Sequence, residues 1–227
     1  MLRLMSFVLL LSFGVSCASK KKLTEIDNSK TIARDFEVRD ASSTIRPGWI
    51  EDAQQWAEQE KMDTDKYRYF SYETEAKVNR EIACNLAKAN ARTDIAAEIT
   101  TFIQKSLGAS EEGRAAIDAN NPKTQPLREF VQNTLAERVQ SLINGAAVIK
   151  TYWEKRNYLV RMGAKKDYIG FTCASLIRLE NTRLKAAVDK ATEEVEKKAD
   201  DESTKDNVKK ALDNLGEDFV KARQGEV

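Results

Sequence analysis

The stretch that decides the fold is EAKVNREIACNLAKANARTDIAAEITTFIQKSL, residues 75–107. Apolar residues recur in it every three or four positions, which is the spacing of one face of an α-helix. The interspersed alanines favour helix formation, and Gly108 suits a C-terminal cap. We therefore predict one long helix buried against a sheet through a single stripe, made of Val78, Ile82, Leu86, Ala89, Ala96, Ile99, Ile103 and Leu107.

Three other segments have the patterns of β-strands. KYRYFSYE, residues 66–73, is rich in aromatic residues, and residues 146–156 and 167–180 follow further along the chain. The last two should pair antiparallel, because the short connection containing Gly163 needs no crossover. Alternation in the last segment predicts one core-facing side, made of Ile169, Phe171, Cys173, Ile177 and Leu179. The opposite side is less apolar, and we expect it to be open for contacts.

A second helix is expected from Pro126 to Ile143, after a loop over residues 109–124. Its apolar face is predicted to consist of Leu127, Phe130, Val131, Leu135, Val139, Leu142 and Ile143. From Asn181 the chain is helical again and highly charged. The fold class is therefore α+β, with long helices packed on a small antiparallel sheet and a charged helical C-terminal tail.

The N-terminal stretch SFVLLLSFGVSCASKKK, residues 6–22, is a targeting signal. Its apolar run is too short for the ~20 residues of a spanning helix, and small residues precede Cys17 as at a signal-peptidase site. The pattern predicts a lipoprotein signal peptide over residues 1–16 and lipidation of Cys17 with fatty acyl chains such as palmitate. The alternatives are a plain secretory signal with a chance cysteine, or an uncleaved anchor.

Lipidation would attach the protein to a membrane without any spanning helix, because two or more acyl chains anchor stably. The residue after Cys17 is Ala18 and not Asp, which favours the outer membrane, facing the periplasm. We divide the remainder into a lipidated tether over residues 17–45, with room for a short element around residues 32–38, an α+β domain over 46–196 and a charged helical tail over 197–227. We expect deletion of residues 200–227 in this tail to leave the domain folded while changing its oligomeric state or partner binding.

Composition excludes several classes of function. The chain has 37 basic and 36 acidic residues, so its net charge of +1 gives no field to attract nucleic acid. It contains no histidine, which removes every catalytic triad or dyad built on that residue and the commonest metal ligand. Two cysteines remain besides Cys17. Cys84 and Cys173 are either small buried hydrophobes or, in an oxidising periplasm, partners in a disulfide.

Several of these segments resemble one known family. RPGWI at residues 46–50, the alanine-rich helix at 75–103, and YWEK followed by DYIGFTCASLIRL resemble the LPP-twenty family of bacterial outer-membrane lipoproteins. Its relatives include the FlgP and FlgT proteins of flagellar basal bodies. The resemblance covers roughly residues 46–190 and implies a compact α+β unit with an assembly or surface-structural role, including association with flagella.

No segment predicts a catalytic, cofactor-binding or metal-binding site. The acidic pair Asp63/Asp65 and the acidic triplet Asp200/Asp201/Glu202 suit solvated turns, with weak cation binding as the alternative. The aromatic strand at 66–73 suits a sheet better than a nucleic-acid platform.

The leading hypothesis is therefore a non-enzymatic envelope lipoprotein that binds envelope proteins or itself, through the mixed sheet face, a sheet edge or the C-terminal helices. The alternative is an envelope enzyme or small-ligand carrier with a histidine-free acidic site.

Overall fold

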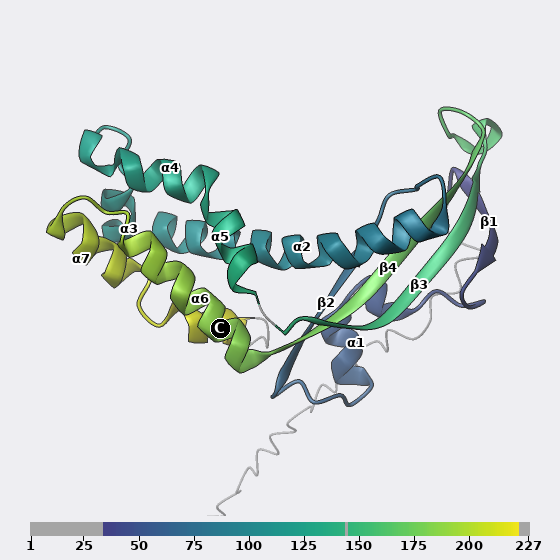
Figure 1. Ribbon diagram of the computed structural model, residues 1–227, viewed down its shortest axis with the longest axis horizontal. Coiled ribbons are helices and arrows are strands. Elements are labelled where there is room, and N and C mark those ends of the chain that lie inside the picture. The colour runs from purple at the N-terminus through teal and green to yellow at the C-terminus, as the bar shows by residue number, and fades with distance from the viewer. Residues whose placement is uncertain (1–33, 144, 223–227) are drawn as a thin grey trace, which may run out of the picture.

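The computed structural model describes residues 34–143 and 145–222 and confirms the α+β fold class (Figure 1). A twisted sheet forms one end of the molecule, most of the helices gather at the other, and the long helix α2 runs across both. The strands are β1 (Phe36–Ala41), β2 (Tyr67–Glu73), β3 (Ala147–Tyr158) and β4 (Tyr168–Glu180). The α-helices are α1 (Ala53–Gln59), α2 (Arg80–Ala109), α3 (Glu111–Ala116), α4 (Gln125–Asn133), α5 (Leu135–Leu142), α6 (Asn181–Glu196), α7 (Glu202–Ala211) and α8 (Leu215–Ala222).

The sheet has the order β1-β3-β4-β2, and every neighbouring pair is antiparallel. The predicted hairpin is confirmed: β3 and β4 pair from Ala147↔Arg178 to Tyr158↔Tyr168. The sequence indicates β1 only as a short element around residues 32–38, of unspecified type. Residues 17–45 were expected to be a tether, but Phe36–Ala41 form an edge strand beside β3, which brings together segments more than a hundred residues apart.

Helix α2 begins later than expected and buries a different face in its first half. Asn79 caps it, its side chain accepting a hydrogen bond from the Ile82 N–H at 2.8 Å. Val78 therefore precedes the helix and is 81% exposed, while Ile82 is 42% exposed. Against the sheet the helix instead buries Ala83, Ala87 and Ala91, because small side chains allow a helix to lie close to strands. In the second half the prediction is correct, with Ile99, Ile103 and Leu107 all buried.

Cys84 of α2 and Cys173 of β4 form a disulfide. Of the two states left open by the sequence, the structure therefore shows the covalent one. It closes beside the buried Ala83 and Ala87, where the helix crosses the sheet.

The second helix is present but divided. α4 and α5 are separated at Thr134, whose φ of −120° leaves the helical region. The predicted apolar face is buried, with Leu142 only partly covered. The segment 109–124, expected to be a loop, contains helix α3 and a 3₁₀ turn, Pro122–Thr124.

The C-terminal helices belong to the core. α7 and α8 form as expected, but Val208, Leu212, Leu215 and Phe219 are buried in the same apolar cluster as Ile99 and Leu127. The expectation that this segment is a tail outside the domain core does not agree with this packing.

Both faces of the sheet are covered over part of their length. α1 and the 3₁₀ turn Gly48–Ile50 pack on the face opposite α2, where they bury Trp49, Trp56, Tyr69, Tyr152, Ala174 and Leu176. The face of β4 expected to be open is thus mostly buried. Ile169 was expected in the core but is 54% exposed. The first turn of α2 does not extend over that part of the hairpin (Figure 1). Within the described residues, no helix has the length and apolar character needed to cross a bilayer.

Candidate binding groove

Among the described residues, the first half of β3 has no neighbouring strand on the side where β1 pairs with its second half. β1 pairs with β3 from Tyr158 to Glu154. The last link beyond it joins Ser42 to Trp153: the Ser42 N–H donates to the Trp153 carbonyl at 3.0 Å, and the Trp153 N–H donates to Ser42 Oγ at 3.1 Å. The chain then turns away over the sheet. Residues 147–152 therefore pair with β4 on one side only.

The open edge presents backbone groups in the geometry of a strand-addition site. In an antiparallel ladder the N–H and C=O of one residue point to the same side, and the side alternates along the strand. Trp153 directs both groups toward β1, so Thr151 directs both toward the open side. Unpaired edges of this kind are templates for another strand.

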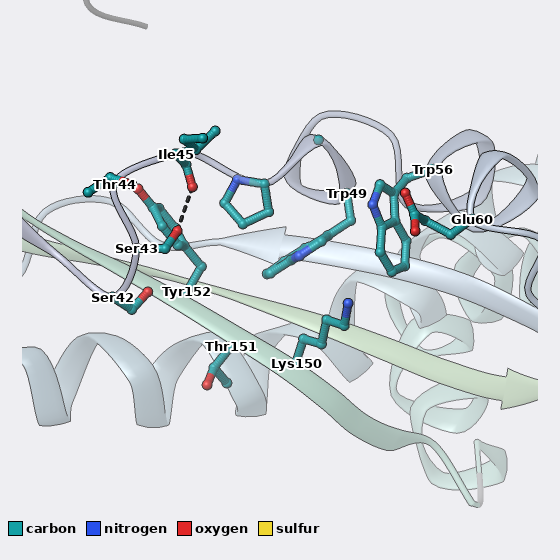
Figure 2. A pocket seen from close by; sticks show the side chains of 12 residues that line it. Ser42, Ser43, Thr44, Ile45, Trp49, Trp56, Glu60, Lys150, Thr151 and Tyr152 are labelled. Carbon is teal, nitrogen blue, oxygen red and sulfur yellow. Dashed lines mark hydrogen bonds between the residues drawn. The ribbon is translucent and has the colours of Figure 1, made fainter. Parts of the chain in front are cut away.

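The open edge borders a groove of about 750 Å³. Its walls come from the segment 42–49, from α1 and from β3 (Figure 2). Trp49 and Trp56 lie next to one another along it, and Lys150 reaches from β3 toward Trp56. The Lys150 Nζ lies 4.4 Å from the centroid of the Trp56 ring, within the range of a cation–π interaction. Thr151 also lines the groove, so the open backbone edge and the aromatic wall belong to one site.

A partly buried charge network, with Glu154 at its centre, fixes the segment that forms the groove wall. Arg46 donates two hydrogen bonds to Glu73, at 2.6 and 3.0 Å. Arg156 donates to the same carboxylate at 2.8 Å and to Glu154 at 2.7 Å. The Tyr152 hydroxyl donates to the other Glu154 oxygen at 2.9 Å. Two guanidinium groups thus bridge two carboxylates and join the segment before α1 to β2 and β3.

The pKa shifts in the charge network indicate a structural role for it and not a role in acid–base catalysis. Burial by itself would raise the pKa of Glu73, but the hydrogen bonds and charge of Arg46, with those of Arg156, outweigh it and hold that pKa below its usual value. Burial, and then the neighbouring Glu154, raise the pKa of Tyr152 above its usual value. Glu73 is therefore ionised and Tyr152 neutral at neutral pH, and neither is placed to exchange protons there.

The residues considered from the sequence are dispersed over the molecule. Cys17, the predicted lipidation site, lies outside the described residues. Asp63 Oδ1 accepts from the Lys66 N–H at 3.0 Å in a turn, and Asp201 caps α7 by accepting from the Thr204 N–H at 3.0 Å. In the described ranges no three carboxylate, cysteine or histidine side chains gather as they would around a metal ion.

The sequence analysis missed the charge network and the groove. One local signal for the network is present: Glu154 and Arg156 stand two apart in YWEKR, which places opposite charges on one face of a strand. Nothing local indicates that Arg46 and Glu73 complete it, since both are distant in sequence.

The aromatic strand is explained by packing. Tyr69 faces α1 and Phe70 faces the helical core, so β2 has no row of exposed rings on which bases would stack.

Comparisons of the chain with protein-family models, with curated proteins and with solved structures gave no match.

Proposed function

We propose that this protein is a non-enzymatic component of the bacterial cell envelope, anchored by lipid at Cys17, that binds another polypeptide through the groove beside β3. The signal-like sequence before Cys17 supports export and lipidation, and Ala18 supports the periplasmic face of the outer membrane. The resemblance to LPP-twenty lipoproteins supports a surface- or flagellum-associated assembly as the setting.

The observation that carries the binding proposal is the unpaired edge of β3 at Thr151. A partner strand placed there would continue the line of β1, and its backbone would satisfy the Thr151 N–H and C=O. Alternate side chains of that strand would face Trp49 and Trp56. The preferred partner is therefore an extended segment with apolar side chains at every second position.

The same site gives little support to an enzyme or small-ligand carrier. A catalytic acidic site needs a carboxylate whose pKa lies near the working pH. Glu73, beside this groove, instead has a lowered pKa and is held by Arg46 and Arg156.

A proline at position 151 tests strand addition directly. Thr151→Pro removes the N–H that faces the open side, where proline is compatible with an edge strand. Thr151→Val keeps that N–H and is the matched control. A photo-crosslinking residue in place of Thr44, on the exposed rim of the groove, reports the occupant in living cells.

We expect a discrete envelope-protein adduct from the Thr44 position with wild-type Thr151 and with Thr151→Val, and its loss with Thr151→Pro. An adduct that survives the proline, while circular dichroism shows an intact fold, would rule out strand addition. An adduct of twice the chain mass would assign the edge to self-association instead.

Lipid attachment is tested separately: Cys17→Ser should abolish incorporation of labelled palmitate and release the protein from membranes in a carbonate wash.

A further inference from the structure

The tip of the β3–β4 hairpin projects beyond the rest of the fold. It comprises residues 159–167, including the 3₁₀ turn Val160–Met162, and lies past the start of α2, at the opposite end of the molecule from α7 (Figure 1). It belongs neither to the groove nor to the helical core, so its surface has no role in the site described above.

The tip exposes large apolar side chains. Val160 is 56% exposed, and Ile169 and Tyr168, at the base of the tip, are 54% and 39% exposed. Burial of such side chains in an apolar or interfacial environment is favourable by roughly 25 cal/mol per Å². The described fold leaves them in water.

The tip is also cationic. Residues 159–167 carry three basic residues, Arg161, Lys165 and Lys166, against one acidic residue, Asp167. Arg161 pairs with Glu37 of β1, whereas no ion pair to Lys165 or Lys166 is present within the described residues. Both lysines are exposed. Exposed apolar residues beside uncompensated lysines are the combination that binds the interface of an anionic membrane.

The described chain begins beside this tip. The Leu159 N–H donates to the Asp35 carbonyl at 2.9 Å, so the connection from Cys17 enters the fold next to the hairpin loop. Sixteen residues lie between Cys17 and Arg34. Even fully extended, a segment of that length spans at most about 60 Å. A lipid on Cys17 would therefore hold this end of the molecule nearest the bilayer.

The backbone of the tip is well braced. Gly163 adopts a left-handed φ of 108°, and the Val160 N–H donates to Asp167 Oδ1 at 2.7 Å. The Ala164 N–H donates to the Leu159 carbonyl at 3.2 Å, closing the loop at its base. A braced loop loses little conformational entropy when it docks.

We propose that the β3–β4 tip is a second membrane contact, in which Val160 enters the interface and Lys165 and Lys166 bind the phosphates of anionic phospholipid headgroups. This proposal rests on the proposed lipid attachment at Cys17, which would turn the tip toward the bilayer, but membrane binding by the tip is measured separately from lipidation. Contact at the tip would orient the molecule with the helical end, α3 to α8, away from the bilayer.

The test uses the chain from residue 17 onward with Cys17→Ser, which keeps every described residue and carries no lipid. It is sedimented with vesicles of phosphatidylglycerol and phosphatidylethanolamine, or of phosphatidylcholine alone. Lys165→Gln/Lys166→Gln is compared with Lys209→Gln/Lys210→Gln, a second exposed lysine pair on α7 at the far end of the molecule, in which Lys210 forms a surface ion pair with Asp206. Both variants change the net charge by the same amount.

We expect binding to the anionic vesicles only, weakened on the order of 30-fold by the tip variant and unchanged by the α7 variant. Val160→Ser should weaken binding as well, and about 0.5 M salt should remove most of it. Equal binding by the two lysine variants, or no binding of the parent chain to anionic vesicles, would overturn the inference. Either result leaves palmitate labelling of Cys17 unaffected, so failure at the tip is distinguishable from failure of the anchor.

Discussion

Cys84 on α2 and Cys173 on β4 are joined by a disulfide that spans 89 positions of sequence and connects the long helix to an interior strand of the sheet. A link of this separation restricts the unfolded chain strongly, because loop-closure entropy grows with the length of the closed loop. Its formation fits the oxidising compartment proposed for the protein.

Removing the disulfide should lower stability without changing the fold. In a Cys17→Ser background, we expect Cys84→Ala/Cys173→Ala to reduce the free energy of unfolding by about 2–5 kcal/mol in urea. Dithiothreitol should produce a similar loss in the parent and none in the double variant. Equal unfolding midpoints for oxidised and reduced parent protein would contradict this expectation.

The charge network should be intolerant of losing one carboxylate. Glu154→Gln leaves Arg156 buried with a weaker partner, and breaking a buried pair from one side costs about 3–5 kcal/mol. Glu217→Gln is the matched control, because Glu217 forms an exposed pair with Lys221 at 3.8 Å, and such pairs contribute about 0–1 kcal/mol. Urea unfolding of both variants gives the comparison, and similar losses would show that the network contributes no more than a surface pair.

The sequence predicts local features well and distant pairings poorly. The β3–β4 hairpin and the buried face of α4 and α5 follow from periodicity over neighbouring residues. β1 does not, since six residues of mixed polarity form a strand only because β3 lies beside them. The sequence analysis placed Ile82 on the buried face of α2 because Ile82 is large and apolar. The structure buries Ala83 instead, because a small side chain lets the helix lie close to the sheet.

The groove and the network show the same limit. Arg46, Glu73 and Arg156 come from three separate segments, and their meeting depends on the order of the strands. No residue-level pattern specifies that order. The open edge at Thr151 is likewise defined by where β1 ends, which is a property of the assembled sheet.

The network also predicts a pH dependence. The pKa of Glu73 is lower in the folded protein than its ordinary value of 4.5, so the folded state binds fewer protons than the unfolded state near that pH. The stabilisation from Glu73 is therefore complete at neutral pH and is lost as the pH falls below 4.5 toward the folded value. Urea unfolding of the parent and of Glu73→Gln should differ at pH 7 and converge in acid. A constant difference from pH 7 to pH 3 would be inconsistent with this assignment.

The last prediction concerns the C-terminal helices, which the sequence alone presents as a charged appendage. Phe219 of α8 is buried and meets Phe102 of α2 edge-to-face, with ring centroids 5.1 Å apart. The Arg68 guanidinium of β2, also buried, donates to the Val220 carbonyl. Deleting residues 200–227 would remove Phe219 and Val220 and uncover Phe102, Arg68 and the apolar surface around them.

We therefore expect the truncated chain to lose cooperative thermal unfolding, measured by circular dichroism, and not merely to change its oligomeric state. Because truncation removes many contacts at once, Phe219→Ala isolates one of them and should cost about 3–5 kcal/mol. Lys221→Ala, at an exposed position on the same helix, should change stability by less than about 0.5 kcal/mol. A truncated chain that melts cooperatively near the parent temperature, together with a neutral Phe219→Ala, would place α7 and α8 outside the folding unit.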